Sequence, residues 1–297
     1  MTTTALVFPG QGSQRPGMGA PWAGRPEWEL VDIASGVVGI DVAHLLLAAD
    51  ADELRPTARA QLATHVVSLM VLACLRDRVD VAVVAGHSLG EYTALVAAGA
   101  LEPTDSIRLV AERGAAMQSA CELAPGTMAA VLGADTDAVD EACSRTPDAW
   151  PANYNAPQHV VVSGTVAGVA AASELAKELG ARRVLPLPVG GAFHTPLMEP
   201  AAERLRAALQ AAPFGTAALP VISNVDALDH RDGWAGRLQS QLLSPVQWSR
   251  TMQSLQARGI ERVLECGPGG VLTALARRVD GIAAVALAGP ADLETLL

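Results

Sequence analysis

The sequence predicts an α/β fold: a mostly parallel sheet with a hydrolase-like nucleophile elbow, into which a small ferredoxin-like domain is inserted. Three observations support this fold class. Strand, glycine turn and helix alternate at both ends of the chain, a Gly-x-Ser-x-Gly pattern follows one of these strands, and the middle has the order βαββαβ. At 297 residues, the chain is long enough for about two domains.

The two ends of the chain predict the large domain. Ala5 to Phe8 is a first apolar strand, and Val81 to Ala85 is a β-branched strand before a glycine turn. Arg262 to Glu265 repeats this pattern near the other end, and helix-like stretches lie at 61–75, 91–99 and 271–278. Alternating strands and helices form a parallel sheet covered by helices. We therefore expect residues 1–126 and 191–297 to build one catalytic α/β domain.

The middle of the chain predicts a small domain at residues 127–190. Its expected strands are 128–132, 150–154, 160–163 and 182–187, and its expected helices are 135–143 and 166–179. This is the order of a ferredoxin-like unit. Because ligands commonly bind between domains, we expect the functional site where the two domains meet.

Composition excludes several classes of protein. Hydrophobic residues make up 50% and charged residues 18% of the chain, which excludes a disordered protein. The net charge of −10 argues against non-specific nucleic-acid binding, which needs a basic face. Lys177 is the single lysine and lies in a polar helix-like stretch, so Schiff-base and P-loop chemistries are not expected.

Targeting and metal signals are also missing from the sequence pattern. No run of about 18 apolar residues indicates a membrane span, and the N-terminal residues have no basic signal-peptide region, so we expect a cytoplasmic protein. The cysteines are widely spaced, at 74, 121, 143 and 266. We interpret them as small core residues and expect no metal site and no disulfide framework.

The strongest chemical signal is Gly86-His87-Ser88-Leu89-Gly90, placed between a strand and a helix. In this context the pattern predicts a nucleophile elbow, which lifts the Ser88 hydroxyl to the start of the helix. The backbone N–H of Leu89 and the helix dipole can then stabilise an oxyanion there. The alternative is a tight turn that merely uses glycine.

A serine nucleophile needs a base, and six histidines are available. His194 follows a glycine-rich turn that returns to the large domain, which would hold it over the interdomain region, although position alone leaves an ordinary loop histidine open. The others are weaker candidates: His44 and His65 in helix-like stretches as surface or core-edge residues, His87 on a turn where neighbouring side chains diverge, His159 entering a strand and His230 in a polar loop.

Two further features are ambiguous on their own. Arg113 lies about 80° from the centre of the apolar face of its helix-like stretch, which on pattern alone favours a surface arginine with a buried stem. The loop from Phe8 to Gln14 contains Gly10 and Gly12, but it matches a dinucleotide fingerprint or a P-loop only weakly. A loop whose N–H groups complete an oxyanion hole fits better.

Taken together, these segments resemble the malonyl-CoA:acyl-carrier-protein transacylase family, which includes the acyltransferases of fatty-acid and polyketide synthases. The matching motifs occur in order along nearly the whole chain. They are Pro9-Gly10-Gln11-Gly12-Ser13-Gln14, Gly86-His87-Ser88-Leu89-Gly90-Glu91-Tyr92, Arg113-Gly114 with Met117-Gln118, Gly191-Ala192-Phe193-His194-Thr195-Pro196-Leu197-Met198, Asn224-Val225-Asp226, Pro245-Val246-Gln247-Trp248 and Gly267-Pro268-Gly269.

The resemblance implies a role for each matching residue. Ser88 would be the acylated nucleophile and His194 its base. The resemblance implies that a backbone or amide oxygen supports the histidine in place of a triad aspartate, and Gln247 matches the position near it. The remaining implied roles are an oxyanion hole from the backbone N–H groups of Gln11 and Leu89, a malonyl-carboxylate partner at Arg113, and an acyl pocket lined by Phe193 and Met117.

Some positions refine or depart from the family pattern. Phe193 and Leu89 occupy positions that in polyketide acyltransferases favour malonyl over methylmalonyl units. The segment that usually reads Thr-Gln-Pro-Ala is interpreted as 58–61, which puts Arg59 at the cleft-lining glutamine or displaces that glutamine. His159 replaces a glutamine, and Gly270 a lysine, so strict malonyl specificity and carrier docking stay open.

The expected activity is therefore malonyl transfer from malonyl-CoA to the phosphopantetheine thiol of an acyl carrier protein, through a malonyl-serine intermediate. No metal or redox cofactor is implied, and we expect a monomer that binds neither nucleic acid nor membrane. The alternatives are a thioester hydrolase that releases stalled acyl groups from carrier proteins, a transacylase for another acyl unit, and an inactive docking subunit. Both fatty-acid and polyketide pathways fit, and the Gly-Ala-Phe-His segment favours a free-standing polyketide acyltransferase. Candidate carrier contacts are Arg182, Arg183, Arg250, Arg277 and Arg278.

Overall fold

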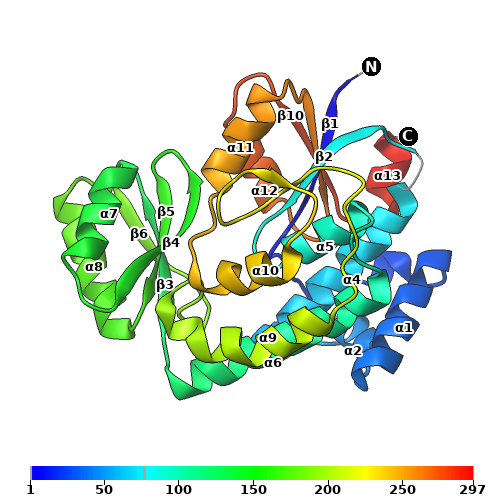
Figure 1. Cartoon of the computed structure of the whole chain (residues 1–297), viewed down its shortest axis with the longest axis horizontal. Coiled ribbons are helices and arrows are strands. Elements are labelled where there is room, and N and C mark those ends of the chain that lie inside the picture. The colour runs from blue at the N-terminus through cyan, green and yellow to red at the C-terminus, as the bar shows by residue number, and fades with distance from the viewer. Residues whose placement is uncertain (1, 76–77, 297) are drawn as a thin grey trace.

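The computed structural model describes residues 2–75 and 78–296 (Figure 1). Its larger sheet has six strands in the order β10-β9-β1-β2-β7-β8. Neighbouring strands run parallel except for the final pair, β7 with β8, which is antiparallel. The strands are β1 (Thr4–Phe8), β2 (Val81–Gly86), β7 (Val221–Ile222), β8 (Asp229–His230), β9 (Arg262–Cys266) and β10 (Ala283–Leu287). The mostly parallel sheet predicted from the sequence is confirmed.

Helices cover both faces of this sheet. Alternate residues of β1 enter two separate cores: Leu6 and Phe8 pack into one, and Ala5 and Val7 into the other. The α-helices of this part are α1 (Glu29–Val38), α2 (Val42–Leu47), α3 (Ala51–Leu54), α4 (Thr57–Leu75), α5 (Gly90–Ala97), α6 (Pro103–Leu123), α9 (Glu199–Ala211), α10 (Trp234–Leu243), α11 (Trp248–Ala257), α12 (Val271–Ala276) and α13 (Pro290–Leu296). Short 3-10 turns lie at Ala20–Trp22, Pro26–Trp28 and Pro196–Met198.

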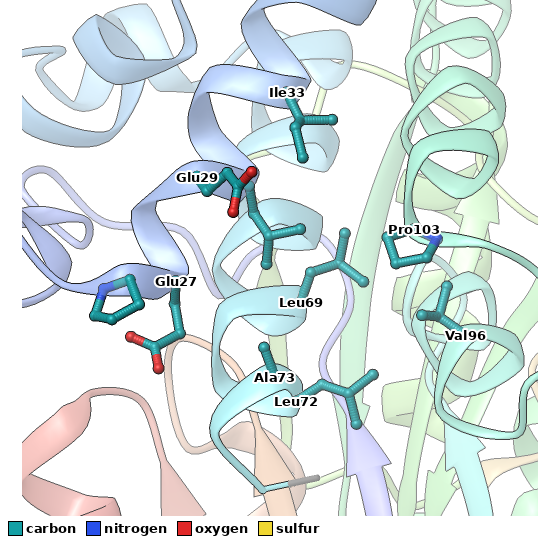
Figure 2. Close-up of a pocket in the computed structure, with 10 residues that line it drawn as sticks. Glu27, Glu29, Ile33, Leu69, Leu72, Ala73, Val96 and Pro103 are labelled. Carbon is teal, nitrogen blue, oxygen red and sulfur yellow. The ribbon is translucent and has the colours of Figure 1, made fainter.

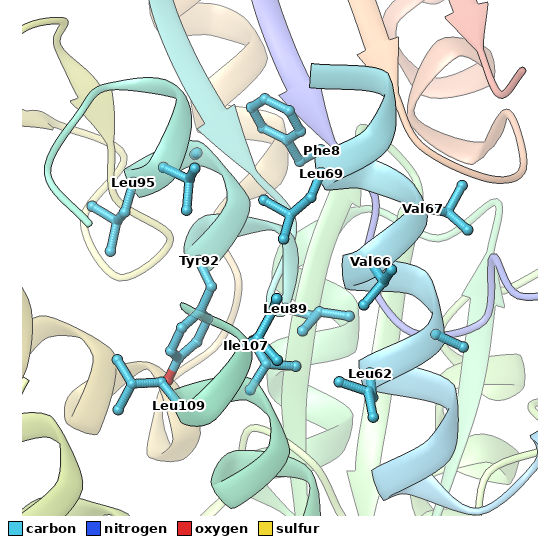
Figure 3. Packing of buried hydrophobic residues seen from close by; sticks show 14 of the residues in the cluster. Phe8, Leu62, Val66, Val67, Leu69, Leu89, Tyr92, Leu95, Ile107 and Leu109 are labelled. Atoms are coloured by element: carbon cyan, nitrogen blue, oxygen red, sulfur yellow. The ribbon is translucent and has the colours of Figure 1, made fainter. Parts of the chain in front are cut away.

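The larger core is built around α4. Figure 3 shows Leu62, Val66 and Leu69 of this helix beside the buried side chains that surround the elbow. By length and composition α4 is apolar enough to cross a membrane, with a mean hydropathy of 1.5 over its most apolar window. However, 72% of that window is buried inside the fold. It is a core helix, and its apolar character on all sides follows from contacts on all sides.

A second, four-stranded sheet has the order β4-β5-β3-β6, and every neighbouring pair is antiparallel. Its elements are β3 (Thr127–Leu132), α7 (Thr136–Ser144), β4 (Ala149–Ala156), β5 (His159–Gly164), α8 (Val166–Glu178) and β6 (Arg183–Pro186). They enclose a core of their own, to which Val131, Val160 and Val162 contribute. This order confirms the predicted ferredoxin-like unit; the domain limits at 126/127 and 190/191 stay a prediction.

The two sheets are connected by backbone hydrogen bonds as well as by the chain. The Tyr154 N–H donates to the carbonyl of Val246 over 2.9 Å, and the Val246 N–H donates to the carbonyl of Ala152 over 2.9 Å. Val246 therefore extends the edge of β4 with the segment that precedes α11. This contact holds the smaller unit, the green part of Figure 1, against the larger one.

Candidate active site

The site begins at the sharp turn between β2 and α5. Ser88 has a φ of 51°, in the left-handed region that non-glycine residues rarely adopt. A Cβ on Gly86 would overlap the backbone of Gly90, and a Cβ on Gly90 would overlap the carbonyl of Phe8. Both glycines are therefore required by close backbone approach. Such strain at a single polar residue is typical of a nucleophile elbow.

His194 lies next to the elbow serine. Its Nε2 is 2.8 Å from the Ser88 Oγ, and its Nδ1 is 2.8 Å from the carbonyl oxygen of Gln241. Since the carbonyl can only accept, Nδ1 carries the proton and Nε2 is free to accept the serine proton. Burial and the nearby Arg113 cation lower the pKa of His194 to about 3, so the imidazole is neutral at pH 7.

Arg113 enters the same site from α6. Its side chain is buried, with the residue only 1% exposed, so the surface position that the helix pattern alone favoured is wrong. Its Nη1 donates to the Gln61 Oε1 over 2.6 Å, and its Nη2 donates to the Ser88 Oγ over 3.0 Å and to the Gln241 Oε1 over 3.1 Å. The guanidinium carbon lies 5.6 Å from the centre of the Tyr92 ring. The helix pattern missed this burial because polar groups from three other segments surround the guanidinium.

The loop after β1 lies beside these groups. The Gln11 Oε1 accepts a hydrogen bond of 3.3 Å from the Gln61 Nε2, which connects this loop to α4. Within residues 2–75 and 78–296, the backbone N–H groups of Gln11 and Leu89 donate to no protein acceptor. Free N–H groups flanking a serine are what an oxyanion hole requires.

Comparison with known proteins agrees with this geometry. Residues 5–289 match the acyl transferase domain family. The malonyl CoA-acyl carrier protein transacylases of Bacillus subtilis (strain 168) and Escherichia coli (strain K12) are each 40% identical to the chain. The matches cover 99% of this chain and 96% of the Bacillus protein, and 100% of this chain and 99% of the Escherichia protein.

The chain belongs to the malonyl-CoA:acyl-carrier-protein transacylase family. Solved structures agree with this membership. An acyl carrier protein S-malonyltransferase from Vibrio cholerae has a TM-score of 0.94 and 38% identity, covering all of both chains. A malonyl-transacylase solved in complex with its type II polyketide-synthase acyl-carrier protein has a TM-score of 0.95 and 36% identity, covering 100% of this chain and 99% of that one.

In this transacylase a backbone oxygen supports the histidine, which is one of the two kinds expected, but it comes from a residue other than Gln247. Gln247 was expected to support His194, but Nδ1 is bonded to the backbone carbonyl of Gln241 instead. The backbone N–H of Gln247 donates to the Asn224 carbonyl over 2.9 Å, which fixes the start of α11. A backbone carbonyl can come from any residue type, so a sequence pattern could not identify it.

Of the two alternatives left open for the cleft-lining glutamine, the structure agrees with a displaced glutamine. Gln61, two residues after Arg59, contacts Arg113 and is fully buried. Arg59 is exposed and forms an ion pair with Glu53, with 3.2 Å between Nη1 and Oε1. In this transacylase it is therefore Gln61, and not Arg59, that contacts the buried arginine.

The two predicted pocket residues lie beside the polar site. Phe193 directly precedes His194 and is buried in the larger core. Met117 is also buried, and its Sδ is 3.2 Å from the Gln61 Nε2. Met117 therefore contacts a residue of the site, and Phe193 is next to the base in sequence. Their role in holding an acyl group stays a prediction.

Sequence reasoning missed three polar residues that complete the site. Gln241 contacts His194, Arg113 and the Ser88 carbonyl, and no motif marked it. The Asn224 Oδ1 accepts from the Ser88 N–H over 2.6 Å. Glu91 is fully buried, and this burial raises the pKa of its carboxyl to about 7. Asn224 and Glu91 lie in motifs that carry the family resemblance, but the resemblance assigned them no role.

Two of the other histidines form hydrogen bonds away from the Ser88 hydroxyl. The His87 Nε2 is 2.9 Å from the Asn155 Oδ1 of β4, and this contact connects the elbow to the smaller unit. His65 is fully buried between the hydroxyls of Thr93 and Ser106, at 2.9 and 2.8 Å, so its expected place at the surface or core edge is wrong.

A partly open pocket lies away from this site. It measures about 360 Å³, and Figure 2 shows Ile33 of α1, Leu69 and Leu72 of α4 and Val96 of α5 around it. Ser88 is not among its lining residues. Among the described residues, no group of three or more His, Cys, Asp or Glu side chains is placed to hold a metal ion.

Proposed function

We propose that this chain transfers a malonyl group from malonyl-CoA to the phosphopantetheine thiol of an acyl carrier protein. One observation carries the proposal: a buried guanidinium lies 3.0 Å from the hydroxyl that the neutral His194 activates. A cation at the nucleophile itself selects an acyl group that ends in a carboxylate. The Bacillus and Escherichia relatives of this chain are named as malonyl CoA-acyl carrier protein transacylases.

In the first half-reaction, Ser88 Oγ attacks the thioester carbonyl while His194 Nε2 takes the hydroxyl proton. The oxygen of the tetrahedral intermediate accepts hydrogen bonds from the N–H groups of Gln11 and Leu89. The carbon–sulfur bond then breaks, and CoA leaves as a thiol with the proton from His194. The product of this step is a malonyl-serine ester.

In the second half-reaction, the phosphopantetheine thiol attacks the ester and gives its proton to His194. The intermediate collapses, and the proton returns to Ser88 Oγ as the ester bond breaks. Because His194 is buried with a lowered pKa, it begins each half-reaction as a neutral base. No metal or redox group is needed to balance either step.

Arg113 supplies the selectivity. The malonyl carboxylate is one methylene from the reacting carbonyl, so a carboxylate on the guanidinium places that carbonyl near Ser88. A planar guanidinium binds a carboxylate through two parallel hydrogen bonds. A neutral acyl group would displace solvent from a buried cation without replacing its hydrogen bonds, which disfavours acetyl and longer neutral chains.

The other functions fit these contacts less well. A hydrolase that removes neutral acyl groups gains nothing from a buried cation at the nucleophile. An inactive docking subunit needs neither the bond between Ser88 and His194 nor the buried Arg113. A different acyl unit remains compatible only if it also carries a carboxylate close to the thioester.

The cellular role is a finer part of the proposal. We infer a cytoplasmic monomer that serves as a free-standing acyltransferase, in polyketide synthesis or in fatty-acid synthesis. Carrier proteins are acidic, and this chain is also acidic, with a net charge of −10, so long-range attraction cannot bring the two together. The carrier protein would therefore dock on a local patch of arginines. Candidate contacts are Arg182, Arg183, Arg250, Arg277 and Arg278.

Intact-protein mass spectrometry tests the proposed function. After mixing with malonyl-CoA, the protein should gain one malonyl mass, and Ser88→Ala should gain none. Adding a carrier protein with its phosphopantetheine arm should move that mass to the carrier. If the wild-type protein gains no malonyl mass, the proposed function is wrong.

A further inference from the structure

The carboxyl group of Glu91 is buried one helical turn after the nucleophile, and the two half-reactions do not use it. Its Oε2 accepts hydrogen bonds from the Gln241 Nε2 over 2.6 Å and from the Asn224 N–H over 3.3 Å. Its Oε1 has no hydrogen-bond partner within the described residues. The residue is fully buried. A buried carboxylate in this position requires a compensating charge.

Gln241 connects this carboxyl group to the substrate-selecting cation. Its Oε1 accepts from the Arg113 Nη2 over 3.1 Å, and its Nε2 donates to Glu91. Only this orientation of the amide satisfies both neighbours, because the guanidinium can only donate and the carboxylate can only accept. The Gln241 amide therefore links the Arg113 guanidinium to the Glu91 carboxyl group through two consecutive hydrogen bonds.

Arg113 has no carboxylate in direct contact among the described residues. Its hydrogen-bond partners are the neutral side chains of Gln61, Ser88 and Gln241. The Glu91 carboxyl group interacts electrostatically with Arg113 in the direction that stabilises both charges. Glu91 is thus the acidic group at the other end of the hydrogen-bond chain that begins at Arg113.

We propose that Glu91 is the counter-charge of Arg113 in the empty enzyme and takes up a proton when a malonyl carboxylate binds that arginine. The inference rests on the proposed function, in which Arg113 binds the malonyl carboxylate. With substrate bound, one cation would face two buried anions, and protonating Glu91 from solvent removes the excess negative charge. Glu91 acts through Gln241 and is a positioning residue.

The surrounding titratable groups leave Glu91 as the one that changes charge near neutral pH. The pKa of Tyr92, on the same helix, is raised to about 12 by burial. The pKa values of His65 on α4 and of His194 are both lowered to about 3, and burial also lowers the pKa of His87. Arg113 keeps its charge. Burial raises the pKa of Glu91 itself to about 7, within the range where the enzyme can be assayed.

The sign of the resulting pH dependence is fixed. A protonated Glu91 favours a bound carboxylate and an ionised Glu91 opposes it, so malonyl loading should weaken relative to acetyl loading as the pH rises. If the bound carboxylate raises the pKa of Glu91 by one pH unit, the malonyl-to-acetyl ratio falls by about tenfold from its low-pH value to its high-pH value. Titrations of His194 and of CoA affect both substrates and cancel in the ratio.

The test is a competition between malonyl-CoA and acetyl-CoA for Ser88, read by intact mass at pH values from 6 to 9. In the wild-type enzyme the malonyl-to-acetyl ratio of loading rates should fall by about tenfold. In Glu91→Gln the ratio should not change with pH, because the carboxamide still accepts from Gln241 but cannot ionise. Glu112→Gln is the matched control: it removes a half-buried carboxylate next to Arg113 in sequence that pairs with Arg204, so its ratio should fall as in the wild type.

Two outcomes overturn the inference. One is a wild-type ratio that stays constant with pH, which decides the matter even if Glu91→Gln does not fold. The other is a folded Glu91→Gln enzyme that retains the wild-type fall. Both outcomes require malonyl loading of Ser88, so they differ from failure of the proposed function, in which no malonyl mass appears at all.

Discussion

The Nη2 of Arg113 and the Oγ of Ser88 are 3.0 Å apart, so the substrate-binding cation donates directly to the nucleophile of the empty enzyme. The same Oγ lies 2.8 Å from the base nitrogen of His194. The serine hydroxyl therefore accepts from a cation while it donates to a neutral imidazole. Such a contact stabilises negative charge on the oxygen as its proton leaves.

Arg113→Ala should lower the rate of malonyl loading by about a hundredfold or more, because it removes a buried partner of the carboxylate. The rate of acetyl loading should change much less. The malonyl loading rate of Arg113→Lys should lie between those of the wild type and Arg113→Ala, because an ammonium keeps the charge but cannot span Gln61 and Gln241 as the guanidinium does. Rates of mass gain with each acyl-CoA measure this, and equal losses for both acyl groups would contradict the role given to Arg113.

Acetyl loading should stay nearly constant as the pH falls from 8 to 5. The pKa of His194 is lowered to about 3, so the base remains neutral over this range. A histidine with an ordinary pKa near 6.5 would instead lose about tenfold in rate for each pH unit below that value. Single-turnover rates of acetyl transfer to Ser88 measure the profile, with circular dichroism at each pH as the control for folding. A decline that begins near pH 6.5 would show that the imidazole is not protected by burial.

Gln61→Ala should weaken malonyl loading by about tenfold, because the buried Arg113 Nη1 then loses its 2.6 Å acceptor. Arg59→Ala is the matched control on the same helix. Its exposed side chain contacts Glu53 and not the site, so loading should remain at the wild-type rate. Both variants are compared by initial rates at low malonyl-CoA concentration. An effect of Arg59→Ala alone would restore the position first expected from the sequence.

His65 should make the fold sensitive to acid. Burial lowers its pKa from 6.5 to about 3, so its contribution to stability is fully present above pH 6.5 and is lost as the pH falls toward 3. Between pH 6.5 and 5 this amounts to about 2 kcal/mol. Urea unfolding at the two pH values measures how much the free energy of unfolding falls between them. This fall should be smaller by that amount in His65→Gln than in the wild-type protein. An equal loss in both proteins would mean that His65 takes no part in the acid response.

The sequence predicted the parts of the site that local backbone determines. Ser88 was identified because the turn between β2 and α5 needs glycine at 86 and 90, and this requirement is visible in five consecutive residues. The two sheets were predicted for a similar reason, because strand and helix periods are local patterns. The element bounds of the smaller unit differ from the expected ones by one or two residues.

The polar contacts around Arg113 could not be predicted in this way. They join α4, α6, α10 and the elbow, whose approach depends on packing between segments far apart in the chain. Gln241 illustrates the difficulty, since it acts on His194 through a backbone carbonyl that carries no residue-specific signal. The expectation for Gln247 failed because the motif marks a residue type, whereas the contact is a backbone carbonyl. Of the two alternatives for the cleft-lining glutamine, the displaced one fits, since Gln61 and not Arg59 contacts Arg113.

The central place of β1 determines the order in which the protein can assemble during synthesis. Thr4 pairs with Val81 on one side and with Arg262 on the other, so β1 lacks one neighbour until β9, far along the chain, has been made. The strands and helices from Thr127 to Pro186, in contrast, are contiguous and can pair with one another as soon as they emerge. We therefore expect the inserted unit to fold first during synthesis, and the sheet that carries the nucleophile to close only after β9 has emerged.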